Sequence, residues 1–365
     1  MNSSDPAALP PENPNLEVSI IIPARNEEAN LSACLESLTA QCGVTFEIIV
    51  VDDGSTDRTR EIAQKFSGVR VISAGTVHAG WTGKSNAVVA GGKEARAKWL
   101  LFTDADTVHL PASLARALAE VKQKQADLLS YSPKQVVVTF AERAVMPVIF
   151  AELAAQYPPH KVRELGAEIA AANGQYILVR HAAYDAVGGH AAVATEILED
   201  VALARLFRNA SQRLHFRYGG DAVRTRMYRN WGQLRDGWTK NLALLFPRAE
   251  FLAFQSLILW IAAWSTIAIA VSGATSRHFV WILVAAFWLL VYRRIRTAHF
   301  AAVNNMLAMA FGLPMFAYLL LRSKKAHASG QVSWKGRTYI VSAPTEPRLA
   351  RPVSKIESQK LRAEN

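Results

Sequence analysis

The chain has 365 residues, of which 41 are Lys or Arg and 30 are Asp or Glu, so its formal net charge is +11. Hydrophobic residues make up 51% of it and charged residues only 19%, a composition that excludes intrinsic disorder and fibrous repeats. Most of the hydrophobic excess lies in residues 251–321, which predicts a soluble domain followed by a membrane region.

The chain divides into four predicted segments. Residues 1–15 have neither a basic start nor an apolar core, so we expect a disordered leader rather than a signal peptide. An α/β domain is expected over 16–245, membrane helices over 246–325 and a basic tail over 326–365. With no export signal before it, the α/β domain is expected to be cytoplasmic.

Strands and helices are predicted to alternate between residues 18 and 103. Apolar runs predict buried strands at 18–22, 46–52, 69–73 and 99–103. Apolar periodicity predicts helices at 27–40, 57–66 and 84–96. This alternation, with strands that are apolar throughout, indicates a parallel sheet covered on both faces. Ligands bind at the carboxyl ends of the strands in such sheets, so the candidate chemistry is expected there.

Polar residues follow three of these strands. The segment PARNEE begins at Pro23 after the first strand, VVDDGSTD ends the second, and Asp104 and Asp106 follow the fourth as DAD. Helix capping accounts for many acids at such positions, and it is the preferred explanation for Glu28 and Asp57.

For Asp53, Asp104 and Asp106 a shared site is the better explanation. Three carboxylates that converge on one edge of a sheet repel one another unless a cation or hydrogen-bond donors offset the charge. The two acids of Asp104-x-Asp106 lie on the same side of an extended segment. Hard oxygen ligands at this spacing suit Mg²⁺ or Mn²⁺ shared with the phosphates of a substrate.

The segment GWTGKS at 80–85 raises the possibility of a Walker A loop. His78 stands where that motif requires its first glycine, and several residues separate it from the strand that ends at Ser73, so a P-loop NTPase is rejected. Lys84 would offset negative charge beside a diphosphate. The alternative is an incidental Lys in the first turn of a helix.

The motifs PARNEE, VVDDGSTD, GWTGKSNA and FTDAD, in this order and spacing, resemble those of family 2 glycosyltransferases, whose α/β domain has the Rossmann-like GT-A fold. The resemblance runs from about Val18 to Lys240. It is closest to membrane-associated members directed at lipids, including carotenoid- and hopanoid-associated ones. The heptapeptide 333–339 also resembles a tail motif of these members.

The resemblance implies roles for the acids. Asp53 would contact the nucleotide base, Asp104 would lie near the ribose or sugar, and Asp106 would ligate a divalent cation, Mg²⁺ or Mn²⁺, on the diphosphate. The remaining residues implied to line the nucleotide-sugar pocket are Pro23, Ala24, Arg25 and Glu27.

The pair Glu199-Asp200 precedes a predicted helix, so capping is again an alternative. The resemblance implies that Asp200 is the catalytic base, which deprotonates the acceptor hydroxyl for an in-line, inverting attack on the anomeric carbon. The cation and Lys84 would stabilise the leaving nucleoside diphosphate. Glu199 is expected on the acceptor side of the same site.

A helix is expected around 228–240, with Trp231 and Trp238 near one face and basic residues around them. This composition suits a helix at the membrane interface, with Trp231 near the acceptor, although a packing helix of the soluble domain is nearly as good an explanation. Processive members of the family carry Gln-x-x-Arg-Trp here. Asp236 and Gly237 follow Gln233 instead, which argues against a processive enzyme.

Two runs without charge, 251–271 and 300–321, are long enough to span a bilayer, whereas 279–292 is short and suits a short or re-entrant segment. Basic residues at 293–296 and in the tail both favour the cytoplasm, yet three full spans would place the tail outside. We expect a cytoplasmic tail that meets anionic lipid head groups. No motif for nucleic-acid binding is present.

These features lead us to expect an inverting glycosyltransferase in the inner or plasma membrane, multi-pass, with its catalytic domain in the cytoplasm. It would move a sugar from a nucleotide-diphosphate donor, expected to be a UDP-sugar, to a hydroxyl or carboxyl of a membrane lipid. Two alternatives stay open. One is transfer to polyprenyl phosphate, whose anionic oxygen has less need of Asp200. The other is a non-catalytic, nucleotide-binding membrane scaffold.

Overall fold

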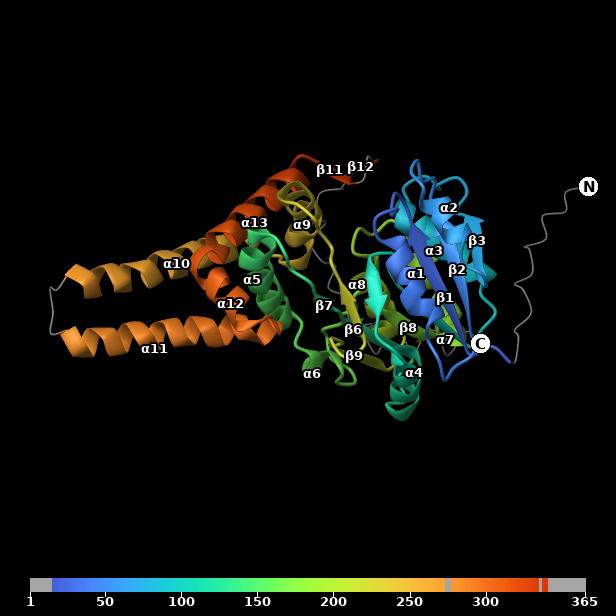
Figure 1. The fold of residues 1–365 in the computed structure, drawn as a ribbon, viewed down its shortest axis with the longest axis horizontal. Helices are drawn as coiled ribbons and strands as arrows, with labels where there is room; N and C mark the ends of the chain where they lie inside the picture. Colours follow the sequence, from blue (N-terminus) through green and yellow to red (C-terminus); the bar gives the residue numbers. More distant parts are fainter. Residues whose placement is uncertain (1–14, 273–276, 335–336, 341–365) are drawn as a thin grey trace, which may run out of the picture.

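The computed structural model describes residues 15–272, 277–334 and 337–340. The expected leader up to residue 14, and the basic tail beyond residue 340, lie outside the described residues. An α/β domain is followed by long helices, two of which project from it as a hairpin (Figure 1).

A seven-stranded sheet forms the centre of the α/β domain, in the order β3-β2-β1-β4-β8-β6-β9. Its strands are β1 (Val18–Ala24), β2 (Phe46–Asp52), β3 (Val69–Ser73), β4 (Trp99–Phe102), β6 (Leu128–Ser132), β8 (Ile177–Arg180) and β9 (Leu214–Tyr218). The four strands expected between residues 18 and 103 are present, and all of them run parallel.

The parallel arrangement does not extend through the whole sheet, because β8 runs antiparallel to both β4 and β6. The sheet is mixed. Both faces of β8 are covered, so Ile177, Leu178 and Val179 are all buried and give an unbroken apolar run. Such a run has the same pattern whether the strand is parallel or antiparallel to its neighbours, so composition does not reveal its direction.

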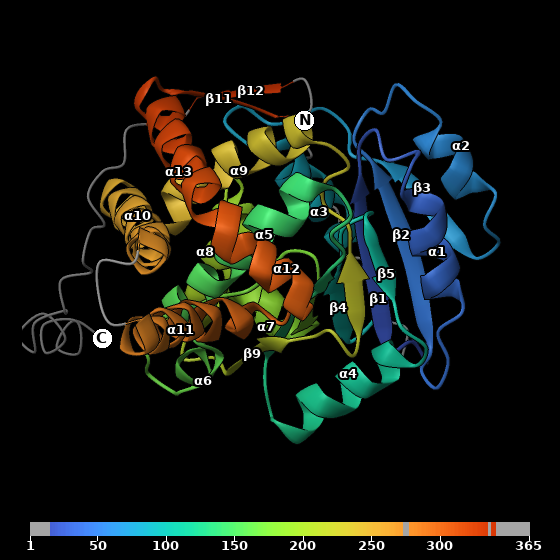
Figure 2. The same ribbon diagram turned by 60° about the vertical axis from the view of Figure 1, so that its left-hand side comes forward.

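Helices cover both faces of the sheet, and β1 shows how the sequence arranges this. Successive side chains of a strand point to opposite faces. Ile20 and Ile22 pack with α1 (Leu31–Thr39), α2 (Thr59–Gln64) and α4 (Ser113–Gln123), whereas Ile21 packs with the opposite layer. That layer contains α3 (Gly83–Glu94), α7 (His181–Ala186), η1 (Gly189–Val193) and α8 (Glu199–Asn209). Figure 2 shows α1 and α2 on one side of the sheet and α3 on the other.

A second, small sheet has the order β5-β10-β7. Its strands are β5 (Thr107–His109), β10 (Val223–Thr225) and β7 (Lys134–Gln135). Strands of two or three residues carry no periodic pattern, so the sequence did not predict them. This sheet joins the segment that follows Asp106 to the chain that leads into α9 (Trp231–Leu245).

The helical region has a core of its own, built around α5 (Phe140–Gln156), α9, α10 (Ala249–Ser272) and α13 (Leu313–Ala328). Further elements are α6 (Pro159–Val162), α11 (Arg277–Ile295), η2 (Arg296–Ala298), α12 (Ala302–Leu307) and the π-helical η3 (Ala308–Gly312). The strands β11 (Gln331–Trp334) and β12 (Arg337–Ile340) form a two-stranded ribbon. Although α5 and α9 lie within the expected 16–245 domain, their buried side chains pack in this helical core.

The last apolar run is interrupted by η3, which ends two residues before Pro314. Here the chain comes very close to α5, since a Cβ on Gly312 would lie 2.2 Å from the carbonyl oxygen of Ala144. Glycine is therefore required for the contact between η3 and α5.

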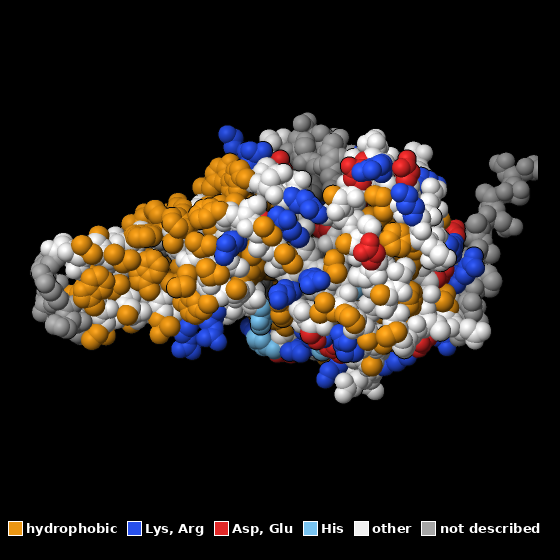
Figure 3. Space-filling model, in the orientation of Figure 1, with side chains coloured by type: hydrophobic (Ala, Val, Ile, Leu, Met, Phe, Trp, Pro, Cys, Tyr) orange, Lys and Arg blue, Asp and Glu red, His pale blue; other side chains and the backbone are white. Residues whose placement is uncertain are grey.

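Among the described residues, two helical stretches are long and apolar enough to cross a membrane, Ala249–Ser272 and Ala302–Ala328. They differ in exposure, because 17% of the apolar window of the first is buried and 50% of that of the second. Large apolar side chains along α10 and α11 are exposed, among them Phe251, Ile261, Trp281 and Leu290. In Figure 3 the hairpin of α10 and α11 is largely orange, with Lys and Arg gathered nearer its base.

Candidate active site

A cavity of about 1,080 Å³ lies between the carboxyl edge of the large sheet and the helices α5 and α9. Of the eleven residues predicted for the site, ten line it: Pro23, Ala24, Arg25, Glu27, Asp53, Lys84, Asp104, Asp106, Glu199 and Asp200. Trp231 is not among the lining residues. Its ring lies nearly parallel to that of Tyr318, with the centroids 6.2 Å apart.

The end of β1 and the end of β2 form one corner of the cavity. Arg25 Nη1 donates to the carbonyl oxygen of Asp53 over 3.0 Å and lies 3.8 Å from Asp53 Oδ2. The backbone N–H of Asp53 donates to the carbonyl oxygen of Ala24, continuing the pairing of the two strands. This corner is therefore built by the sheet itself, which fixes where Asp53 and Arg25 stand.

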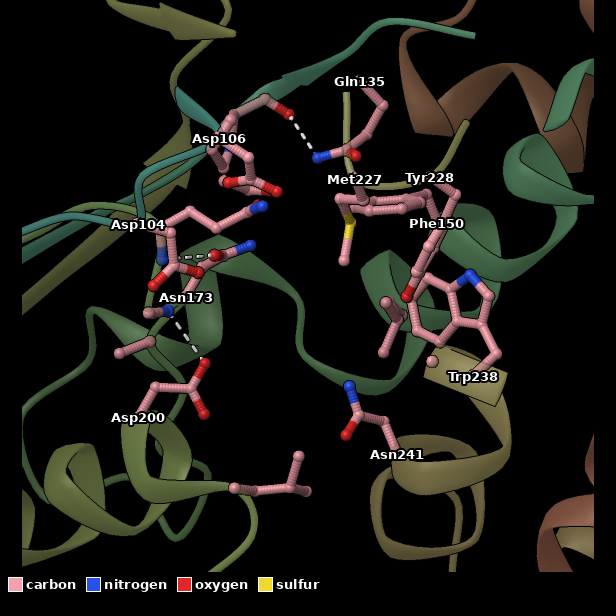
Figure 4. A pocket seen from close by; sticks show the side chains of 18 of the residues that line it. Asp104, Asp106, Gln135, Phe150, Asn173, Asp200, Met227, Tyr228, Trp238 and Asn241 are labelled. Atoms are coloured by element: carbon pink, nitrogen blue, oxygen red, sulfur yellow. Dashed lines mark hydrogen bonds between the residues drawn. The ribbon is translucent and has the colours of Figure 1, made fainter. Parts of the chain in front are cut away.

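The loop that carries Asp104 and Asp106 is held by its backbone. Thr107 Oγ1 donates to the carbonyl oxygen of Asp104 over 2.7 Å, and Thr225 Oγ1 to that of Asp106 over 3.1 Å. Because hydroxyl groups satisfy the two carbonyls, the loop is fixed while both carboxylates line the cavity (Figure 4). Thr225 belongs to β10, and no pattern in the sequence predicts that it supports this loop.

Lys84 connects the Asp104 loop to α8. Its Nζ lies 2.8 Å from Asp104 Oδ1 and 2.9 Å from Glu199 Oε1. The side chain of Thr82 caps α3 by accepting from the N–H of Ser85, so Lys84 stands in the first turn of that helix. Burial by itself lowers the pKa of Lys84, but the charges of Asp104 and Glu199 outweigh burial and hold it well above its usual value. Lys84 is therefore a cation at any ordinary pH.

Asp200 lies in the first turn of α8, where the positive end of the helix favours an acid. Its Oδ2 accepts from the N–H of Gly174 over 2.8 Å, and its Oδ1 from the N–H of Val201 over 2.8 Å. Burial and the neighbouring charge of Glu199 raise the pKa of Asp200 to about 6, against the effects of Lys84 and the two N–H groups.

The pKa of Glu199 shifts in the opposite direction to that of Asp200. Burial raises its pKa, yet the charges of Lys84 and Lys240 bring it below the usual value of a glutamic acid. The pair thus divides into Glu199, an anion held by Lys84, and Asp200, a carboxyl group that exchanges its proton near neutral pH. The second property is what a general base requires.

Several lining residues were not predicted. The segment 171–175 crosses the cavity between Asp104 and Asp200, and its Asn173 and Gly174 carry only a turn signal in the sequence. A Cβ on Gly174 would lie 2.9 Å from Lys84 Nζ, so a larger residue at this position would displace the end of the Lys84 side chain. Lys240 and Asn241 come from α9, and burial lowers the pKa of Lys240. Only the folded chain brings these residues to Asp200.

The wall opposite the acids is aromatic and aliphatic. The ring of Phe150 on α5 lies 6.0 Å from that of Trp238 on α9 and 6.0 Å from that of Phe300. Figure 4 shows Asp104, Asp106 and Asp200 on one side, and Phe150, Tyr228 and Trp238 on the other. The cavity therefore has an acidic end and an apolar end.

The acidic end fits a divalent cation shared with a substrate. Asp104 and Asp106 supply hard oxygen donors, while no group of three or more His, Cys, Asp or Glu in the described part of the chain could hold an ion by itself. Mg²⁺ characteristically uses one or two carboxylates and completes its shell with phosphate oxygens and water. This donor set suits a cation that arrives with a diphosphate.

Residues 19–188 match the family described as Glycosyl transferase family 2. The 4,4'-diaponeurosporenoate glycosyltransferase of Staphylococcus aureus (strain USA300) is 28% identical over 342 residues, which cover 89% of this chain and 88% of that protein. The protein of the same description from strain MRSA252 is 28% identical over 346 residues.

Among solved structures, the mannosyltransferase PcManGT from Pyrobaculum calidifontis, in complex with GDP-Man and Mn²⁺, is similar with a TM-score of 0.51 and 16% sequence identity. The match covers 89% of this chain and 91% of that chain. At this identity the likeness is one of fold, and it supports a GT-A-like α/β architecture with a mixed sheet.

Proposed function

We propose that the chain, whose residues 19–188 match glycosyl transferase family 2, is a glycosyltransferase that moves a sugar from a nucleoside diphosphate to a membrane lipid. One observation carries the proposal. The acidic end of the cavity, which suits a diphosphate and its cation, faces an apolar end built by α5, α9 and residues 297–300. A donor and an apolar acceptor can therefore meet at Asp200.

The donor is assigned to the acidic end. Pro23, Ala24 and the other residues of this corner line the nucleotide pocket, with Asp53 toward the base and Asp104 toward the ribose or sugar. Asp106 holds the divalent cation, which when bound neutralises charge on the departing diphosphate. The similar mannosyltransferase was solved with GDP-Man and Mn²⁺, which supports a nucleotide sugar and a divalent cation here. A UDP-sugar is our expected donor.

The reaction is assigned to Asp200 and Lys84. Asp200 accepts the proton of the acceptor hydroxyl as its oxygen attacks the anomeric carbon, and the N–H of Gly174 orients the carboxylate for this. Lys84 holds Asp104 and Glu199 in place and adds positive charge beside the leaving group. A single displacement inverts the anomeric centre and needs no covalent intermediate.

The lipid acceptor is supported by the relative from Staphylococcus aureus, whose name gives diaponeurosporenoate as its substrate, and by the exposed apolar hairpin. Association with a membrane is assigned to α10 and α11. Half of the apolar window of Ala302–Ala328 is buried, as in the core helix of a soluble protein, so the multi-pass arrangement stays a prediction. The cytoplasmic position of the catalytic domain is likewise a prediction.

A label-transfer assay tests the proposal. Membranes that contain the protein are incubated with radiolabelled UDP-glucose, UDP-GlcNAc or GDP-mannose and with Mg²⁺ or Mn²⁺, and then extracted with organic solvent. We expect cation-dependent label in the organic phase, reduced at least about 100-fold in Asp106→Ala. Asp185→Ala removes an exposed acid outside the cavity and serves as the matched control.

The assay also separates the alternatives. Label in the lipid phase that persists in Asp200→Asn would favour an acceptor that is already an anion, such as polyprenyl phosphate. Binding of UDP without transfer to any lipid or to water would favour the non-catalytic scaffold.

A further inference from the structure

The apolar end of the cavity extends to the base of the projecting hairpin. Leu245, which lines the cavity, stands four residues before α10 begins at Ala249. Residues 297–300, which also line it, begin two residues after the end of α11 at Ile295. The two chain segments that flank the hairpin therefore both belong to the cavity wall.

The wall between this base and Asp200 combines polar groups of α9, among them Lys240 and Asn241, with apolar side chains from three parts of the chain. From α5 it takes Phe150, Leu153, Ala154 and Tyr157. From α9 it takes Trp238 and Leu245, and the ring of Phe300 closes it against Phe150. These residues come from three separate parts of the sequence, and their side chains surround a space rather than fill it.

The volume of the cavity lies just above the usual range for one small molecule. A pocket for one small molecule has a volume of roughly 300–1,000 Å³. The cavity here has about 1,080 Å³, and its acidic and apolar ends are lined by different elements. The apolar end is thus available to a second substrate.

We propose that the apolar end is a channel for the hydrocarbon chain of the acceptor, which enters from the membrane at the base of the α10–α11 hairpin and places its polar end at Asp200. This inference rests on the proposed function and adds to it the position, the entrance and the chemistry of the acceptor. The channel takes a single apolar chain, with α5 and α9 as its two walls.

The chain offers a matched pair of variants on α5. Ala154 lines the cavity, whereas Ala155 next to it is exposed and is not among the lining residues. Ala154→Trp places an indole inside the proposed channel, and Ala155→Trp places the same group outside it. Leu153→Trp is a second variant that blocks the channel.

The experiment compares these proteins, in membranes, with the wild type in three measurements. They are UDP binding by calorimetry, release of sugar to water without acceptor, and transfer of label to a total lipid extract. We expect Ala154→Trp and Leu153→Trp to lower lipid labelling at least tenfold while UDP binding stays within about twofold. Ala155→Trp should match the wild type in all three.

A series of n-alkanols from butanol to dodecanol provides a second readout. In the wild type, kcat/KM should rise roughly threefold to fourfold for each added methylene until the channel is filled, because each buried CH₂ contributes about 0.8 kcal/mol. In Ala154→Trp this dependence should flatten, with butanol least affected.

The results distinguish the proposed channel from the proposed function. Lipid labelling by Ala154→Trp and Leu153→Trp at the wild-type rate would overturn the channel and leave the proposed function intact. Loss of UDP binding together with lipid labelling in both variants would also overturn it, since α5 would then support the donor site. A wild type that releases sugar to water but labels neither lipid nor alkanol would overturn the proposed function.

Discussion

The Nζ atom of Lys84 lies 2.9 Å from Oε1 of Glu199, and this contact joins the first turn of α3 to the first turn of α8. Since Lys84 also contacts Asp104, one cation connects the loop that we propose to bind the donor with the helix that carries Asp200, the proposed base. The side chain of Glu199 is only 10% exposed, so its charge depends on this partner.

We predict that Lys84→Met destabilises the protein by about 1–2 kcal/mol, because it removes the cation that contacts Glu199. The partial exposure of Lys84 keeps the effect below that of a fully buried pair. Glu199→Gln in the same chain should recover most of this loss without restoring transfer. Thermal unfolding of the single and double variants checks the prediction. Equal unfolding temperatures of Lys84→Met and wild type would show that the ion pair contributes no stability.

Gly174→Ala should lower transfer while the fold is retained. The added Cβ would lie 2.9 Å from Lys84 Nζ and 3.5 Å from Asp200 Oδ2, so the flexible Lys84 side chain must move away from Asp104 or Glu199. We expect kcat to fall at least about tenfold, since displacement of a catalytic group by a fraction of an ångström is costly. Steady-state kinetics and a thermal melt test this, and unchanged kcat would show that the close approach has no catalytic role.

The rate should depend on pH through Asp200. A base works only when deprotonated, and the pKa of Asp200 is raised to about 6. We therefore predict that kcat/KM for a hydroxyl acceptor is low at pH 5, rises through about pH 6 and is level by about pH 7.5. Asp200→Asn should lower the rate by a factor of about 10²–10⁴ and abolish the acid limb. An identical acid limb in that variant would assign the titration to another group.

Two adjacent glycines of α3 should respond in opposite ways to the same substitution. A Cβ on Gly91 would lie 2.5 Å from Ile21 Cγ2 and 2.8 Å from Val51 Cγ2, so Gly91→Ala should cost about 1–3 kcal/mol through overpacking. On Gly92 the nearest atom is 3.7 Å away, so Gly92→Ala should stabilise by up to about 1 kcal/mol through helix propensity. Equal denaturant midpoints for the two variants would contradict this packing of α3 against β1.

The donor side of the site could be predicted because its residues are placed by local rules. Asp53, Asp104 and the residues after Ile22 each follow a buried strand, and parallel strands bring their carboxyl ends to one edge. The chain between residues 18 and 103 folds as those rules require. The residues that hold these loops in place could not be predicted. Thr225, for example, binds the carbonyl oxygen of Asp106 from a strand of only three residues, which carries no periodic pattern.

The apolar residues of the proposed acceptor side could not be predicted from the sequence. The segment 134–175 contains α5, whose Phe150 and Ala154 line the cavity, yet its apolar residues point to several neighbours at once and show little periodicity. Trp231, selected from the sequence, packs near Tyr318, while Trp238 lines the cavity. Both lie on α9, and which of the two faces the site depends on how that helix packs.

The amino-acid sequence by itself determined the alternating elements of the first hundred residues, the acids at their ends and the long apolar helices, because hydrophobic periodicity and the residues that follow an apolar run are local properties. Only the tertiary structure decided the reversed direction of β8, the approach of Gly174 to Asp200 and the meeting of Phe150, Trp238 and Phe300. Burial of apolar surface is non-directional, so a sequence shows which side chains leave water but not which of them come together.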